Sequence, residues 1–214
     1  MLPRRLNRST GCLVAILLGF SSLPAVAEDA NGHFSLHGLG AQSCAQLVDE
    51  VKKNDPATNS VVLSWLMGYM TARNRLEKNT YDIAPAMPGE AVLQMTNTIC
   101  EKSPDARVET AVDALFKGMA PVRITTESPL LLLQSGDARL QIRRQTFIAV
   151  QQALVKRKLF KGPAEDKMTP ALGAALRAYQ KDEKLTENGL PDVPTVIHML
   201  VASASTKAAG KAVR

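Results

Sequence analysis

Four stretches with helical periodicity occupy residues 43–121. In each, apolar residues recur three or four positions apart, and proline-containing breaks at 54–56 and 103–105 separate neighbouring stretches. The first stretch runs from Ser43, a residue type that often caps helices, to Lys53. The pattern predicts a small helical bundle over residues 43–121.

The second stretch, VVLSWLMGYMTARNRL, is apolar on most faces until Arg73, which is typical of a central helix. We expect Asn59 or Ser60 to cap it. Gly68 costs about 1 kcal/mol in a helix interior, so we expect close helix packing to offset that cost. The third stretch, opened by Pro88, and the fourth present these apolar faces: Val92, Met95 and Ile99, then Val108, Val112, Leu115, Phe116 and Met119.

Residues 122–143 have a different character. VRITT, LLLLQ and RLQI are short runs of β-prone residues, and SGD between the last two is a plausible turn. We expect either a small strand pair or an extended linker.

Helical periodicity returns over residues 144–202. The first helix is expected to end at Gly162-Pro163, the second to run from Thr169-Pro170 to about Glu183, and the third to follow Pro191-Asp192. Their inward faces are Phe147, Val150, Gln151 and Leu154, then Leu172, Leu176 and Tyr179, then Val196, Ile197, Leu200 and Val201. Residues 203–214 are polar, small and basic, and are expected to form a mobile tail. The fold class expected is mainly α.

The first 27 residues follow the order of a secretory signal peptide. Three arginines precede an apolar run at 11–18, and small residues at 25–27 supply a cleavage site. The alternative is a membrane anchor, but the run is well short of the roughly 20 residues that a spanning helix needs. We expect export to the periplasm, no integral membrane segment once the signal is removed, and an irregular glycine-rich lead-in over 28–42.

Composition and charge narrow the picture. The 214 residues are 45% hydrophobic and 21% charged, which suits one large or two small globular domains. Half of the formal net charge of +6 leaves with the signal, as does one of three cysteines. The remaining pair, Cys44 and Cys100, is expected to form a disulfide in an exported protein, with two buried free thiols as the alternative. Aromatic residues make up only 4%, which argues against nucleic acid as a partner.

The stretches VQQALVKRKLF, ALRAYQKDEKL and ENGLPDVPTVIHML, spread over residues 144–201, resemble the peptidoglycan-binding domain family. The resemblance implies a three-helix fold and binding to the cell wall. The chain departs from the family pattern in its acidic turn, where Glu165-Asp166-Lys167 lacks the usual glycine. It departs also at Leu172, where threonine is common, and at Tyr179, where phenylalanine is usual.

The segment from Ser128 to Lys161 carries seven basic residues against one acid, Asp137. Such a segment favours anionic partners, with an ordinary solvated helix face as the alternative. Together with the resemblance it yields these wall-binding candidates for peptidoglycan or another anionic wall polymer: Arg143, Arg144, Lys156, Arg157, Lys158, Lys161, Glu165, Asp166, Tyr179, Gln180 and Asp192.

The N-terminal stretch resembles the small disulfide-linked helical periplasmic domains of the HdeA/HdeB acid-stress chaperones and of the Tai-type immunity proteins. The residues that carry the resemblance are Cys44, Cys100, Pro104, Trp65, Gly68 and Tyr69. It implies a protein client, with acid exposing apolar surface in the chaperone case. Asp49, Glu50, Asp55 and Glu90 are carboxylates that could titrate in this way, or they could be ordinary surface acids.

No catalytic motif is visible, so we expect no enzyme and no cofactor. His33 and His37 are four residues apart, as in a helical metal pair, but they lie in the glycine-rich lead-in without an acidic third ligand. His198 lies beside an apolar helix face. We therefore expect no metal site.

These observations favour a non-catalytic exported protein that binds the cell wall through its C-terminal module and a protein through its N-terminal helices. The alternative is a periplasmic acid-stress chaperone or immunity-type binder. A wall hydrolase is the third hypothesis.

Overall fold

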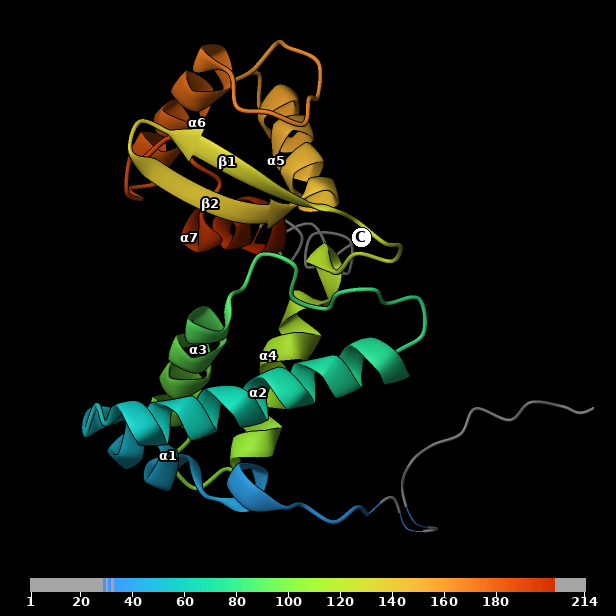
Figure 1. The fold of residues 1–214 in the computed structure, drawn as a ribbon, viewed down its shortest axis with the longest axis vertical. Coiled ribbons are helices and arrows are strands. Elements are labelled where there is room, and N and C mark those ends of the chain that lie inside the picture. The colour runs from blue at the N-terminus through green and yellow to red at the C-terminus, as the bar shows by residue number, and fades with distance from the viewer. Residues whose placement is uncertain (1–28, 30, 32, 203–214) are drawn as a thin grey trace, which may run out of the picture. The chain divides into compact units, whose positions relative to one another are not determined.

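The computed structural model describes residues 29, 31 and 33–202 (Figure 1). The expected signal peptide and tail, residues 1–27 and 203–214, lie outside the described residues. The described residues from Leu36 onward belong to one compact unit, and the few described residues before Leu36 belong to another.

The unit that starts at Leu36 is mainly helical with one small sheet, which confirms the predicted fold class. Its elements are η1 (Gly38–Ala41), α1 (Cys44–Lys52), α2 (Pro56–Leu76), α3 (Gly89–Lys102), α4 (Val108–Met119), η2 (Ala120–Val122), β1 (Leu130–Ser135), β2 (Ala138–Arg143), α5 (Arg144–Lys156), α6 (Pro170–Asp182), α7 (Val193–Val196) and the π-helical η3 (Ile197–Ala202). No helix in the described part of the chain combines the length and apolar character needed to cross a bilayer.

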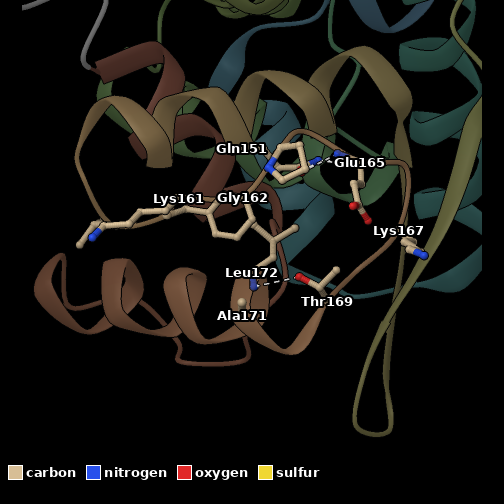
Figure 2. Close-up of a pocket in the computed structure, with 11 residues that line it drawn as sticks. Gln151, Lys161, Gly162, Glu165, Lys167, Thr169, Ala171 and Leu172 are labelled. Carbon is tan, nitrogen blue, oxygen red and sulfur yellow. Dashed lines mark hydrogen bonds between the residues drawn. The ribbon is translucent and has the colours of Figure 1, made fainter.

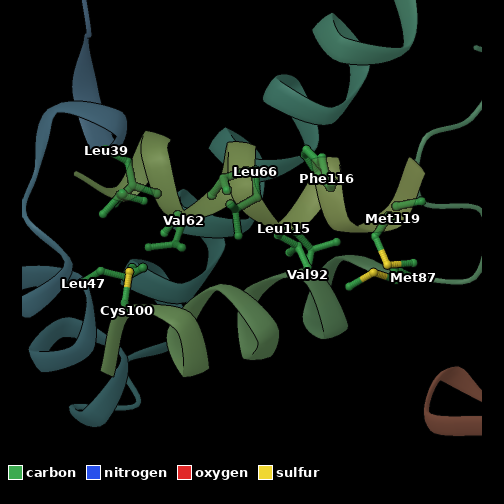
Figure 3. Packing of buried hydrophobic residues seen from close by; sticks show 14 of the residues in the cluster. Leu39, Leu47, Val62, Leu66, Met87, Val92, Cys100, Leu115, Phe116 and Met119 are labelled. Carbon is green, nitrogen blue, oxygen red and sulfur yellow. The ribbon is translucent and has the colours of Figure 1, made fainter. Parts of the chain in front are cut away.

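Helices α1 to α4 share an apolar core that contains the expected Cys44–Cys100 disulfide (Figure 3). The bridge joins the first residue of α1 to α3, and both cysteines are fully buried. Linking positions 56 apart in sequence contributes about 4 kcal/mol in the chain-entropy model. The core around the bridge includes Leu39, Leu47, Val62, Leu66, Met87, Val92, Leu115, Phe116 and Met119.

Helix α2 begins a turn earlier than predicted. Asp55, rather than Asn59 or Ser60, is its cap, because the Asp55 carboxylate accepts hydrogen bonds from the N–H and hydroxyl of Thr58 at 2.8 and 2.7 Å. Pro56 suits the first helical position, which needs no N–H donor. The hydrogen bonds from Thr58, the hydroxyl first, lower the pKa of Asp55.

The expected close packing at Gly68 is wrong. Gly68 is exposed, and a Cβ atom there would meet nothing within 4 Å. The close approach to α2 occurs at Gly40, where a Cβ would lie 2.6 Å from the Trp65 ring. That ring stacks on Tyr69 with 5.2 Å between the ring centroids.

The two strands form the expected antiparallel pair, with Gly136 and Asp137 as the turn (Figure 1). Leu133 and Ile142 face the core, whereas Leu130 and Leu132 are exposed. The register is Leu130–Arg143, Leu131–Ile142, Leu132–Gln141, Leu133–Leu140, Gln134–Arg139 and Ser135–Ala138.

The VRITT segment at 122–126 lies outside this sheet and connects the bundle to the hairpin. Ile124 forms an isolated antiparallel bridge with Asp82, with backbone N···O distances of 3.0 and 3.2 Å. The Arg143 guanidinium then pairs with the Asp82 carboxylate at 3.3 Å and donates to the Ser128 carbonyl at 3.1 Å. These polar contacts fix the start of the hairpin against the loop that precedes α3.

Helices α5, α6 and α7 share a second apolar core with the hairpin and η3. Helix α5 ends at Lys156, earlier than the predicted break at Gly162-Pro163, because Lys158 adopts a left-handed φ of 62°. Most of the predicted inward residues are buried: Phe147, Val150, Gln151, Leu154, Leu172, Leu176, Tyr179 and Val196. The other three, Ile197, Leu200 and Val201, are half-buried. Thr169 caps α6, as its sequence predicts.

Alanine substitution should separate the two glycines of the bundle. Gly68→Ala is expected to stabilise the protein by about 1 kcal/mol, because it improves helix propensity without a clash. Gly40→Ala is expected to destabilise it and to shift the emission of Trp65, the only tryptophan, because the ring must move. Thermal denaturation and fluorescence measure both effects, and equal effects at the two positions would contradict this packing.

Candidate functional site

A pocket opens between α5 and α6 beneath the irregular loop that connects them (Figure 2). Its volume is about 310 Å³. It is lined by Gln151, Leu159, Phe160, Lys161, Gly162, Pro163, Glu165, Lys167, Thr169, Ala171 and Leu172. The pocket exists because α5 ends at Lys156, which leaves the following residues free to form a loop.

The apolar part of the pocket depends on the contact of Phe160 with Gly162. A Cβ atom at Gly162 would lie 2.5 Å from the tip of the Phe160 ring, so any larger residue would displace the ring. Leu172, fully buried on α6, adds to the apolar lining.

Gln151 anchors the loop. Its side chain is buried in α5, where Oε1 accepts the Glu165 N–H at 2.9 Å and Nε2 donates to the Glu165 carbonyl at 2.8 Å. Both backbone groups of Glu165 are therefore satisfied by one amide, shown as dashed lines in Figure 2.

Three charged residues complete the lining: Lys161, Glu165 and Lys167. Both lysines are exposed, and none of the three side chains forms an ion pair within the described residues. The site thus combines an apolar surface with two unpaired cations and one carboxylate, which suits a ligand with both apolar and anionic groups.

Several predicted wall-binding residues are engaged in ion pairs. Arg143 pairs with Asp82 and stacks over the Tyr81 ring at 5.3 Å from its centroid. Arg144 pairs with Asp166 at 2.7 Å, and this hydrogen-bonded pairing raises the pKa of Arg144. These pairs reduce the free charge that the basic segment carries.

Three other predicted residues have interior roles. Asp192 caps α7. Tyr179 is buried, and its hydroxyl forms a hydrogen bond with His198 Nδ1 at 3.0 Å. Burial raises the pKa of Tyr179. Gln180 is fully buried. Its amide bonds to Asn188, Gly189, Leu190 and Thr195. Gln180 therefore holds the turn before α7, and we no longer count it among the residues that could bind a ligand.

Arg157 donates to the Ala153 and Met199 carbonyls and stacks over the Tyr179 ring. Lys156 and Lys158 are exposed but do not line the pocket. Of the predicted residues only Lys161 and Glu165 come together there. Lys167, Phe160 and Thr169 were not predicted, although Lys167 adjoins the acidic turn and Thr169 was identified as a cap.

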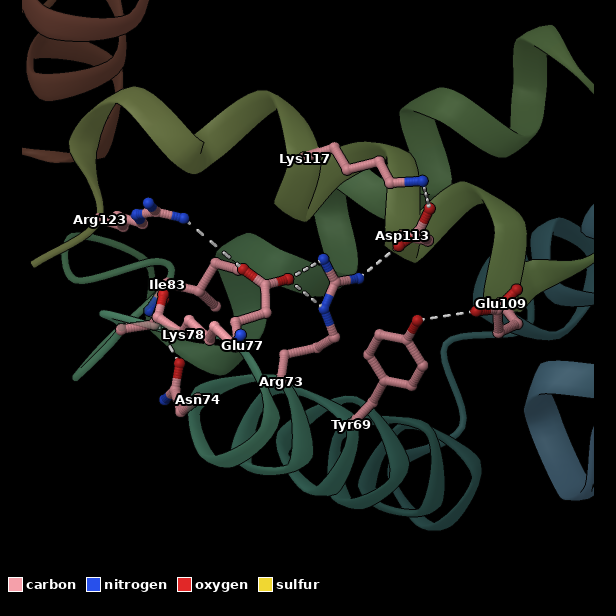
Figure 4. Close-up of polar contacts among 11 residues, drawn as sticks. Tyr69, Arg73, Asn74, Glu77, Lys78, Ile83, Glu109, Asp113, Lys117 and Arg123 are labelled. Carbon is pink, nitrogen blue, oxygen red and sulfur yellow. Dashed lines mark hydrogen bonds and ion pairs between the residues drawn. The ribbon is translucent and has the colours of Figure 1, made fainter. Parts of the chain in front are cut away.

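A separate polar cluster lies between α2 and α4 (Figure 4). Arg73 bridges Glu77, the residue that follows α2, and Asp113 on α4, and Lys117 also pairs with Asp113, at 2.7 Å. Burial works against the Arg73 charge, but its hydrogen bonds, chiefly with Glu77, raise the pKa of Arg73. Nearby, burial and the hydrogen bond to Glu109 raise the pKa of Tyr69 to about 12.

The described residues contain no group of three or more His, Cys, Asp or Glu side chains that could hold a metal ion. Comparison with known proteins finds no matching family model, no similar curated protein and no similar solved structure.

Gln151→Ala should release the loop while Gln152→Ala should not. Gln151 is buried against Glu165, whereas Gln152 is exposed one position along α5. Losing the Gln151 amide leaves two backbone groups of Glu165 unsatisfied, at about 1–3 kcal/mol. Hydrogen exchange at the Glu165 amide, followed by NMR, should accelerate in the first variant alone. Equal exchange in both variants would show that Gln151 does not hold the loop.

Proposed function

We propose that this protein is an exported, non-catalytic protein that binds peptidoglycan through its C-terminal helices. The observation that carries the proposal is the α5–α6 pocket, whose lining combines apolar Phe160 and Leu172 with Lys161, Lys167 and Glu165, three charged residues without an ion pair among the described residues. The pocket includes Glu165 and Lys167 of the acidic turn, which belongs to the segment that resembles peptidoglycan-binding domains.

The chemistry of the pocket matches that of the wall. Peptidoglycan offers sugar rings with apolar faces and stem peptides with free carboxylates. The Phe160 ring suits the former, and the two lysines suit the latter through charge-assisted hydrogen bonds. Glu165 can accept hydrogen bonds from sugar hydroxyl or amide groups. A volume of about 310 Å³ falls at the small end of the range for ligand pockets, about 300–1,000 Å³.

Export is supported by two independent features. The first is the pattern of charge, apolar run and small residues in the first 27 positions. The second is the Cys44–Cys100 disulfide, because stable disulfides are characteristic of oxidising compartments such as the periplasm.

Co-sedimentation with purified peptidoglycan sacculi tests the proposal. The protein should pellet with sacculi at low salt, and added salt should release it, because the lysines contribute through screened charge. The double variant Lys161→Ala/Lys167→Ala should bind at least tenfold more weakly. Lys181→Ala, which removes an exposed charge of α6 outside the pocket, serves as the control. Failure to pellet at low salt, or equal loss in the control, would defeat the proposal.

A second function, that of an acid-activated chaperone, is favoured by the Arg73 cluster. Arg73, Glu77 and Asp113 are all largely shielded from solvent, with side-chain exposures of 16%, 26% and 26%. Protein carboxyl groups as a class become protonated near pH 2–3. In acid the Arg73 guanidinium keeps its charge, and neutral carboxyl groups would not form ion pairs with it, which would weaken the contact of α2 with α4. Opening there exposes the core that includes Leu66 and Phe116.

The acid-chaperone function predicts suppression of client aggregation at about pH 2–3, measured by light scattering with an acid-labile enzyme as client. Asp113→Asn mimics the protonated state, so it should move the onset of protection to higher pH. Asp105→Asn removes an exposed carboxylate outside the cluster and should leave the onset unchanged. Lack of protection at any pH, or the same onset in both variants, would exclude this function.

A further inference from the structure

A groove runs along the free edge of β2. Its volume is about 410 Å³, and β2 contributes most of one wall through Arg139, Leu140, Gln141 and Arg143. The loop from Asp82 to Pro88 forms the other wall. The sheet has only two strands in the described part of the chain, so no strand pairs with this edge.

The hairpin register determines which backbone groups point into the groove. In an antiparallel pair, residues that bond to the partner strand alternate with residues whose N–H and C=O point away. The Arg144 N–H bonds to the Pro129 carbonyl at 2.9 Å and fixes the phase of the alternation. Both backbone groups of Arg139 and Gln141, and the N–H of Arg143, therefore point away from β1, which is the arrangement that an added strand requires.

The opposite wall is fixed in place. Asp82 bridges to Ile124 through the backbone and pairs with Arg143 at 3.3 Å. Ala84, Pro85 and Met87 are buried, which holds the loop in place, and the residues with which the loop lines the groove are mostly apolar. The groove is thus an open strand edge beside a preformed wall.

Charge and pattern indicate what the groove accepts. Arg143 is neutralised by Asp82, whereas Arg139 is exposed and forms no ion pair within the described residues. The groove therefore has an excess positive charge. On an added strand, side chains would alternate between the face of Arg139 and the face of Leu140. Acidic residues suit the first face and apolar residues the second.

We propose that the β2 edge binds an extended segment of a partner protein, with alternating acidic and apolar residues, as a third antiparallel or parallel strand. Main-chain hydrogen bonds to Arg139, to Gln141 and to the N–H of Arg143 supply affinity, and the unpaired guanidinium of Arg139 selects carboxylates. This site is distinct from the α5–α6 pocket and does not depend on peptidoglycan binding.

Fluorescence anisotropy of the full chain with a labelled, end-capped Glu-Val-Glu-Val-Glu-Val-Glu peptide tests the proposal. We expect saturable binding. N-methylation of alternate amides on the face toward β2 should weaken it at least tenfold, because each methyl group removes an edge hydrogen bond. The Arg139→Glu variant should no longer bind the acidic peptide and should instead bind the matching peptide in which lysine replaces glutamate. The Lys181→Glu variant should bind both peptides as the wild type does.

Gln141→Pro provides a second test, because it removes an N–H that points into the groove and leaves the β1–β2 bonds intact. It should abolish binding, with circular dichroism confirming the fold. The proposal would be overturned if the acidic peptide did not bind, or if the N-methylated peptide bound equally well. It would also be overturned if Arg139→Glu kept the peptide preference of the wild type, or if anionic lipid vesicles displaced the labelled peptide and an excess of unlabelled peptide did not. The sacculus assay is unaffected by any of these, so the two proposals can fail separately.

Discussion

Two buried glutamine amides hold the C-terminal helices together. A loop that passes over an apolar core carries N–H and C=O groups that must find partners, and each one left unpaired costs about 1–3 kcal/mol. Gln151 satisfies both backbone groups of Glu165. Gln180 accepts the Gly189 N–H and donates to the Leu190 carbonyl. The connections before α6 and α7 can be irregular because these side chains replace secondary-structure hydrogen bonds.

The pocket follows from this arrangement. Gln151 ties the Glu165 backbone to α5 and so holds the loop after Lys156, whose Phe160 ring lines the pocket between α5 and α6. The buried Gln151 amide bonds the backbone of Glu165, and the charged side chains of Glu165 and Lys167 line the pocket. In the bundle, ion pairs play the part that the glutamine hydrogen bonds play here. The largely buried Arg73 guanidinium pairs with the carboxylates of Glu77 and Asp113.

Helical periodicity was sufficient to predict most of the helices. The β-prone runs and the even cysteine pair favoured the hairpin and the disulfide, each with one alternative left open. Sequence patterns failed where two local signals competed, as when Asp55 outcompeted Asn59 as a cap, and where the neighbour was distant, as at Gly68. The candidate site was harder. A glutamine at an inward position can contact a ligand or satisfy a loop, and Gln180 does the latter through partners 8 to 15 residues away. The pairing of Arg73 with Asp113 spans 40 residues and leaves no periodic trace.

The arginines of β2 have a consequence for the concentrated protein. An open strand edge is a template on which a second molecule can pair and start a fibre. If two β2 edges met, the unpaired Arg139 guanidinium of each copy would add positive charge to the same seam, and like charges brought close together are destabilising. The same side chains that leave the edge available to other sequences therefore act as gatekeepers against self-assembly, and the hairpin can stay uncovered without making the chain prone to aggregate.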